Sequence, residues 1–108
     1  MKKAIPVRIP VYIKTTIAAG DKTYAGVIGN ISANGAFVEN ETKKTVAPFM
    51  PGKELKLKFK TSPGNTLNLN CVVIWLYSKE ATPDGFANSL GLEIIKPPAK
   101  FIKWLTSL

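Results

Sequence analysis

The sequence predicts an all-β protein, a six-stranded antiparallel β-barrel followed by a C-terminal α-helix. Short stretches alternate between apolar and polar residues, and turns that contain Gly or Pro separate them at intervals of ~8–12 residues. The end of the chain changes to the spacing of an amphipathic helix. A chain of 108 residues has the usual size of one domain. We therefore expect a single domain over 1–108, with a flexible N-terminal arm at 1–6.

Six segments are predicted to be strands: Val7–Ile13, Thr23–Ser32, Gly35–Glu39, Lys53–Thr61, Thr66–Ser78 and Ser89–Ile95. The fourth alternates most regularly, with inward Leu55, Leu57 and Phe59 between outward Lys56, Lys58 and Lys60. In the first, Val7 and Ile13 share the inner face, and Pro10 favours an edge or an end of the sheet. The longest expected loop covers 40–53.

The C-terminal segment is predicted to be a helix over 98–108. Pro97-Pro98 stops strand pairing and suits a first helical turn. Phe101, Leu105 and Leu108 then lie along one stripe. A barrel of this size needs its open end covered, and we expect this helix to cover it.

Composition argues against an enzyme. The chain has no histidine, the commonest general base and metal ligand, and its seven acidic residues are scattered singly, so no carboxylate cluster is expected to hold Mg²⁺ or Ca²⁺. Cys71 is alone in an apolar run, which indicates a buried thiol. No segment approaches the ~20 apolar residues of a membrane span. We therefore expect a soluble, cytoplasmic protein without enzymatic activity, metal or cofactor.

Charge points to an anionic partner. The net charge is +8, and fourteen of the fifteen basic residues are lysine, which leaves Arg8 as the one arginine. The outward lysines at 56, 58 and 60 have two interpretations: protection of an edge strand, which we favour, and a docking stripe. Nucleic acid is not expected as the partner, because few aromatic residues accompany the lysines. Trp75 and Trp104 are interpreted as core residues.

The stretch Asn30-Ile31-Ser32-Ala33-Asn34-Gly35 is the most informative motif. Strand periodicity places Asn30 and Ser32 on one face, and Asn34-Gly35 is a strong hairpin signal because both residues tolerate positive φ. In one interpretation the two side chains only satisfy nearby backbone groups. In the other they offer donors and acceptors to a ligand, with Gly35 permitting its close approach.

This stretch resembles the [D/N]xSxxG signature of the PilZ domain family, bacterial modules many of which bind cyclic di-GMP. Three further segments resemble family signatures in the same order: Pro51-Gly52 before the LKLKF strand, Val72–Trp75, and Leu90–Ile94. The resemblance covers nearly the whole chain and implies a PilZ-like, split-barrel type of fold with a helix after the last strand.

The resemblance also implies a ligand site, with one departure. Asn30, Ser32 and Gly35 match the family motif, whereas the upstream RxxxR motif is degenerate or missing and leaves Arg8, Lys2 and Lys3 to meet the phosphates. We therefore expect a cyclic di-GMP receptor or adaptor with weak or impaired binding. The alternative is a degenerate PilZ protein that binds no nucleotide and acts through a protein partner in bacterial signalling, as in pilus or motility adaptors.

Overall fold

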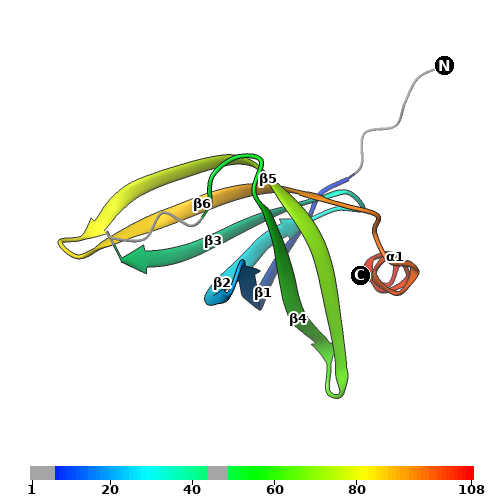
Figure 1. Ribbon diagram of the computed structural model, residues 1–108. Coiled ribbons are helices and arrows are strands. Elements are labelled where there is room, and N and C mark those ends of the chain that lie inside the picture. The colour runs from blue at the N-terminus through cyan, green and yellow to red at the C-terminus, as the bar shows by residue number, and fades with distance from the viewer. Residues whose placement is uncertain (1–6, 44–48) are drawn as a thin grey trace.

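A computed structural model of the protein describes residues 7–43 and 49–108. Within these ranges six antiparallel strands close into a ring in the order β1-β2-β3-β6-β5-β4, and one helix follows the last strand (Figure 1). The elements are β1 (Ile9–Ala19), β2 (Lys22–Ile31), β3 (Gly35–Lys43), β4 (Glu54–Ser62), β5 (Asn65–Thr82), β6 (Gly85–Ile94) and α1 (Ala99–Thr106). The mostly β fold with a C-terminal helix confirms the sequence prediction, while the predicted arm at 1–6 lies outside the described residues.

Several strands are longer than the sequence predicts. β1 continues to Ala19, and β3 continues to Lys43, into the segment expected to be a loop. β6 begins at Gly85, because its first residues pair with the end of β3 up to Lys43↔Gly85. Polar residues on both faces hide this extension in the sequence, and side-chain hydrogen bonds such as Asn88 Nδ2 to Asn40 Oδ1 (3.1 Å) stabilise it. The hairpin of β5 and β6, with β3 beside it, therefore extends to one side of the ring (Figure 1).

The core lies inside the ring and consists of the inward-facing residues of the strands together with Phe49 and the buried residues of α1. Its largest fully buried side chains are Phe49, Phe101, Ile17, Ile28, Ile31, Leu57, Leu69, Leu90, Val38 and Val73. Two predicted core positions are wrong, since Val7 is 79% exposed and Leu108 is 56% exposed. Val7 precedes β1 and Leu108 follows α1, so each lies beyond the element that would have buried it.

The closure between β1 and β4 is the shortest of the strand pairings. Three residue pairs join these strands, from Thr16↔Lys58 to Ala18↔Lys56. Thr15 extends this contact through its side chain, because Thr15 Oγ1 donates a hydrogen bond to the Lys58 carbonyl oxygen (3.1 Å). Beyond that point the described parts of the two strands diverge. The Pro10 end of β1 pairs with β2 alone, in agreement with the predicted edge position.

Helix α1 packs against the core through Phe101 and Leu105. Trp104 lies between the core and the surface, with its ring centroid 5.6 Å from that of Phe59. The Ile102 amide donates to the Pro98 carbonyl oxygen (3.1 Å), which places Pro98 at the start of the helix as predicted. Among the described residues no helix has the length and apolar character needed to cross a membrane.

Cys71 is a buried thiol, as the sequence predicts. Its Sγ donates a weak hydrogen bond to the Leu69 carbonyl oxygen (3.7 Å). Burial in the apolar core raises the pKa of the Cys71 thiol to about 12. The side chain is therefore protonated at neutral pH and acts as a small apolar group.

Candidate functional site

Arg8 and Asn30 form the centre of the candidate site. Arg8 precedes β1 and Asn30 lies near the end of β2, and the pairing Pro10↔Asn30 brings them together. Arg8 Nη1 donates a hydrogen bond to Asn30 Oδ1 (2.9 Å) at the surface. Because the Asn30 oxygen accepts this bond, its amide N–H₂ is directed elsewhere as a donor. Two predicted site residues from distant parts of the sequence thus hold each other in place.

Gly35 lies directly beside this pair, but not for the predicted reason. Neither Asn34 nor Gly35 has a positive φ, so the expected positive-φ hairpin turn is wrong. A Cβ atom at Gly35 would lie 3.1 Å from Arg8 Nη2 and 3.3 Å from the Leu92 carbonyl oxygen. The missing side chain at Gly35 thus lets the Arg8 guanidinium lie close to the backbone, and any larger residue would crowd it.

Ser32 is 1% exposed and takes part in the turn itself. Its backbone amide donates to the Gly35 carbonyl oxygen (2.8 Å), and its Oγ lies within hydrogen-bonding distance of Asn34 Oδ1 (3.3 Å) and the Gly35 oxygen (3.4 Å). The prediction that Asn30 and Ser32 both present exposed polar groups is wrong for Ser32. Its hydroxyl bonds within the turn, and the turn is fixed to β6 because the Ile94 amide donates to the Asn34 carbonyl oxygen (2.9 Å).

Two aromatic rings continue the site across the outer face of the sheet. Phe37 pairs with Asn30 on one side and with Gly91 on the other, and Gly91 in turn pairs with Trp75. The ring centroids of Phe37 and Trp75 are 6.0 Å apart, with an interplanar angle of 36°. We call Phe37 and Trp75 the aromatic row.

The prediction that Trp75 is a core residue is wrong, because its side chain is 45% exposed. The strand pairing shifts between Val73 and Trp75, so Ile74 is an extra residue that breaks the alternation and places Trp75 on the outer face. The indole ring lies across Gly91, where a Cβ atom would collide with it. Trp75 lies in the apolar run Cys71–Leu76, where no alternation of apolar and polar residues shows which side chains face outward. The sequence signal for an outward Trp75 is Gly91, its cross-strand neighbour.

The remaining predicted site residues, Lys2 and Lys3, lie outside the described residues. Among the residues described, no three His, Cys, Asp or Glu side chains lie close enough together to hold a metal ion.

The described site consists of the Arg8 guanidinium, the Asn30 amide and the two rings of the aromatic row. A guanidinium binds anions in a planar fork, and aromatic faces stack on flat heterocycles. The arrangement suits a ligand that combines both chemistries.

The fold is that of a small β-ring module with this candidate site on its outer face. A family model described as the PilZ domain matches residues 6–107. The chain belongs to the PilZ domain family, which confirms the resemblance noted from its motifs. A search among curated proteins found no match.

Solved structures of PilZ proteins share the fold. The PilZ domain of YcgR from Escherichia coli, solved with c-di-GMP, has a TM-score of 0.74 at 12% identity, covering 97% of this chain and 87% of that one. The Bacillus subtilis inhibitor of motility MotI/DgrA has a TM-score of 0.67 at 17% identity, covering 95% and 47%. Borreliella burgdorferi PlzA, solved in complex with c-di-GMP, has a TM-score of 0.56 at 15% identity, covering 89% and 47%. The chain thus spans about half the length of the last two proteins.

Proposed function

We propose that the protein is a cytoplasmic, non-enzymatic receptor for cyclic di-GMP that passes the signal to a protein partner. The observation that carries the proposal is the Arg8–Asn30 hydrogen bond beside the aromatic row. Arg8 would meet a phosphate, the Asn30 amide a guanine edge, and Trp75 the face of a base. The likeness to the ligand-bound PilZ domain of YcgR supports the choice of nucleotide, since the fold is shared.

The single arginine sets the expected strength of binding. Family members that bind through RxxxR use two arginines, whereas this chain has Arg8 alone. Loss of one desolvated, charge-assisted contact commonly costs ~2–5 kcal/mol, which is ~30-fold or more in affinity. Lys2 and Lys3 supply long-range attraction to phosphate without the planar fork. We therefore propose weak, strongly salt-dependent binding.

Isothermal titration calorimetry with cyclic di-GMP at low salt tests the proposal. Arg8→Lys keeps the charge and removes the fork, so we expect it to weaken binding at least ~10-fold. Asn30→Ala and Trp75→Ala should each weaken binding as well, whereas Lys103→Gln on α1 is the control and should not. Equal affinity in all four variants would show that the ligand binds elsewhere, and a loss confined to Lys103→Gln would show that it binds only through net charge.

A second candidate function follows from the same missing arginine. A PilZ domain whose nucleotide site is incomplete can act through protein contacts alone, as a pilus or motility adaptor. The exposed Trp75 and Tyr77 on β5 would then form part of a protein interface, since exposed aromatic side chains are typical anchors of such interfaces. A flat calorimetric trace with the wild-type chain at high ligand concentration would favour this adaptor over the receptor.

A further inference from the structure

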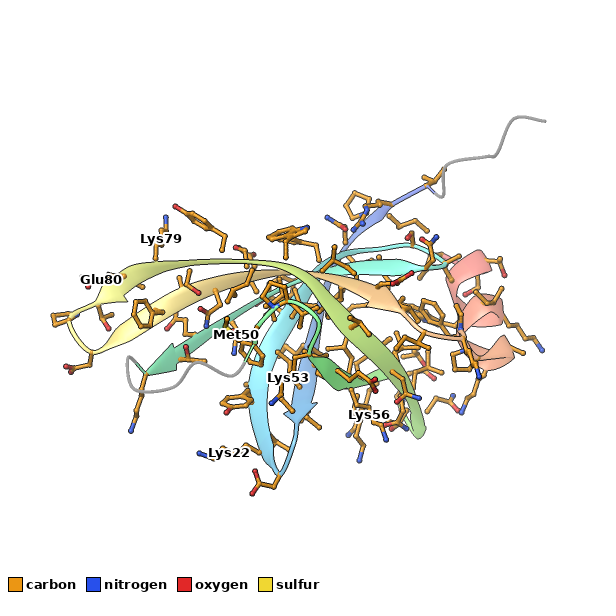
Figure 2. The ribbon with its side chains drawn as sticks, turned by 45° about the horizontal axis from the view of Figure 1, so that its top comes forward. Lys22, Met50, Lys53, Lys56, Lys79 and Glu80 are labelled. Atoms are coloured by element: carbon orange, nitrogen blue, oxygen red, sulfur yellow. The ribbon has the colours of Figure 1, made fainter. Side chains whose placement is uncertain are left out.

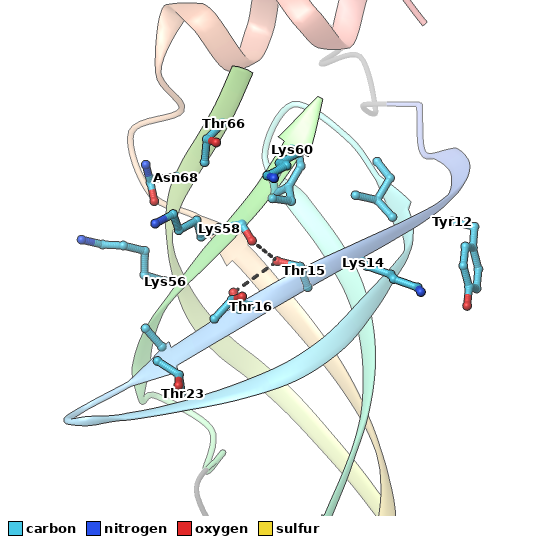
Figure 3. A pocket seen from close by; sticks show the side chains of 13 residues that line it. Tyr12, Lys14, Thr15, Thr16, Thr23, Lys56, Lys58, Lys60, Thr66 and Asn68 are labelled. Carbon is cyan, nitrogen blue, oxygen red and sulfur yellow. Dashed lines mark hydrogen bonds between the residues drawn. The ribbon is translucent and has the colours of Figure 1, made fainter. Parts of the chain in front are cut away.

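A groove whose charged lining residues are all lysines lies away from the candidate site, where β1 and β4 diverge (Figure 3). It has a volume of about 760 Å³, and its lining residues include Lys14, Lys56, Lys58 and Lys60 but no acidic residue. Thr and Asn side chains of β1 and β5 lie among the lysines. We call this the lysine groove.

Edge protection, the interpretation favoured from the sequence, does not account for these lysines. Lys56 and Lys58 lie where β4 is paired on both sides, with β5 along its length and with β1 at the closure. A strand with two neighbours has no free edge to protect. Of the three lysines on β4, Lys60 alone lies beyond the pairing with β1. The lysines therefore need another explanation.

Open strand edges accompany the charge. Within the described residues β1 pairs with β4 only from Thr16 onward, so Ile9–Lys14 has no partner strand on that side. The end of β4 from Phe59 to Ser62 likewise pairs with β5 alone. The Thr15 side chain marks the boundary by bonding to the Lys58 carbonyl oxygen, as Figure 3 shows. Backbone amides and carbonyl groups at such edges can bind an added extended segment.

We propose that the lysine groove is the docking site for an extended acidic peptide segment of a protein partner. The segment would add to the open edge of β1, and its carboxylates would meet the lysines. Strands rise about 3.3 Å per residue, so alternate side chains of an added strand have the same spacing as Lys56, Lys58 and Lys60. An acidic residue at every second position would therefore meet Lys14 and Lys60 beside the open edge, and a segment that continues along the groove brings its next carboxylates toward Lys58 and Lys56 on the outside of the closure.

Two other anionic partners fit the groove less well. Single-stranded nucleic acid binds through stacking on exposed aromatic rings, and Tyr12 is the one exposed aromatic side chain in the lining because Phe59 is buried. A membrane surface is flat and cannot use backbone groups that lie in a groove. An extended peptide uses both the charge and the edges.

The proposal is independent of nucleotide binding. The lysine groove is lined by residues of β1, β4 and β5 and by Thr23 at the start of β2, and its lining contains neither Arg8 and Asn30 nor the aromatic row. Loss of the nucleotide site through Trp75→Ala would leave peptide docking intact. Failure of one proposal therefore does not imply failure of the other.

Fluorescence anisotropy with a labelled peptide of five Glu-Thr repeats is the direct test. The triple variant Lys56→Gln/Lys58→Gln/Lys60→Gln should weaken binding by ~10-fold or more, because each contact contributes up to ~1 kcal/mol. The matched control, Lys43→Gln/Lys79→Gln/Lys103→Gln, removes the same charge from residues that do not line the groove, and Figure 2 shows Lys79 far from Lys56. We expect this control to change binding by less than about 3-fold.

A second peptide separates strand addition from simple charge attraction. Five Glu-Pro repeats carry the same charge but lack every second backbone N–H, so they should bind ~10-fold more weakly. The Glu-Thr peptide should also slow hydrogen exchange in the first half of β1. Equal binding of the two peptides, equal loss in both triple variants, or tighter binding of oligo-dT or of vesicles rich in anionic lipid would each overturn the proposal.

Discussion

Trp75 and Gly91 depend on each other at the surface of the sheet. The indole ring occupies the space that any larger residue at position 91 would need, and it extends toward Phe37. A glycine in a strand often marks a place where another group lies close to the backbone, and here that group is the indole ring. The extra residue Ile74 places Trp75 on the outer face, and the missing side chain at Gly91 then lets the indole ring lie against the sheet and shape the candidate site.

Gly91→Ala should displace the indole ring and destabilise the fold. The added Cβ collides with Trp75, so we expect a loss of ~1–3 kcal/mol in the free energy of unfolding, measured in urea. The indole N–H signal of Trp75 should move in NMR spectra while that of Trp104 stays in place. In a Trp75→Ala background the same substitution should cost far less. An equal cost in both backgrounds would show that Trp75 is not the residue displaced.

Cys71 makes stability fall at high pH. Folding raises the pKa of its thiol from 9.0 to about 12, so between these values the unfolded state loses a proton that the folded state keeps. Stability is therefore full below pH 9 and falls as the pH rises toward 12, by at most about 1.4 kcal/mol per pH unit from this group.

Chemical unfolding of wild type and Cys71→Ala between pH 8 and pH 10.5 measures this contribution. The difference in unfolding free energy between the two should shrink as the pH rises, because the alanine variant lacks the titrating group. A difference that stays constant over this range would contradict a buried thiol with a raised pKa. All other residues are identical in the two proteins, so the comparison isolates Cys71.

The residues of the candidate site were partly predictable. The motif identified Asn30 and Gly35, and Arg8 stood out as the one arginine; the structure brings these three together. The exposure of Trp75 could not be read, because an extra residue in a strand shifts the alternation without leaving a pattern. The hydrogen bonding of the Ser32 hydroxyl within the turn could not be predicted from the sequence either, since it depends on the conformation of the turn.

At the scale of elements, the connection between β6 and α1 contains a strained residue. Lys96 has φ 46, the one non-glycine residue with positive φ in the described chain. The left-handed conformation costs a side-chain-bearing residue roughly 1–2 kcal/mol. The chain adopts it between Ile94 and Pro97, where it turns from the last strand to bring Phe101 onto the core.

Lys96→Gly should stabilise the protein by ~0.5–1 kcal/mol, because the relief of strain exceeds the added entropy of the unfolded chain. Lys103→Gly is the matched control, since it removes the same side chain from the interior of α1. There it should destabilise by ~1 kcal/mol. Thermal unfolding of both variants measures the sign of each change in stability. Destabilisation by both substitutions would show that Lys96 is not strained.

Element types were more predictable than element ends. All six strands and the helix were expected, because alternation and turn residues mark them locally. The extension of β3 to Lys43 and the start of β6 at Gly85 were missed, since partner strands stabilise these ends through contacts between residues distant in sequence. Buried polar pairs such as Asn40 and Asn88 look like loop residues when read one strand at a time.

At the scale of the whole molecule, the ring is closed unequally. β4 pairs with β5 from Glu54↔Val72 to Ser62↔Asn65, but it pairs with β1 through three residues. Few pairings mean a low cost of local opening. The closure between β1 and β4 is therefore expected to open before the rest of the ring, and it borders the lysine groove.

Native-state hydrogen exchange followed by NMR should show this asymmetry within one strand. Amides of β4 that face β1 should exchange faster than those that face β5, so protection should alternate along the strand. Uniform protection along β4 would mean that the ring opens only by global unfolding.

Thr15→Val sharpens the test, because it removes the hydroxyl that donates to the Lys58 carbonyl oxygen at the end of the closure. It should lower the free energy of local opening by ~0.5–1.5 kcal/mol and speed exchange at the amides that face β1. Amides between β5 and β6 should change less. Thr106→Val is the matched control, since it removes a threonine bond to the Lys103 carbonyl oxygen (2.9 Å) at the exposed end of α1. If the closure opens locally, exchange at the amides that face β1 should respond to Thr15→Val and not to Thr106→Val. Faster exchange throughout the ring in both variants would show that the closure does not open as a separate unit.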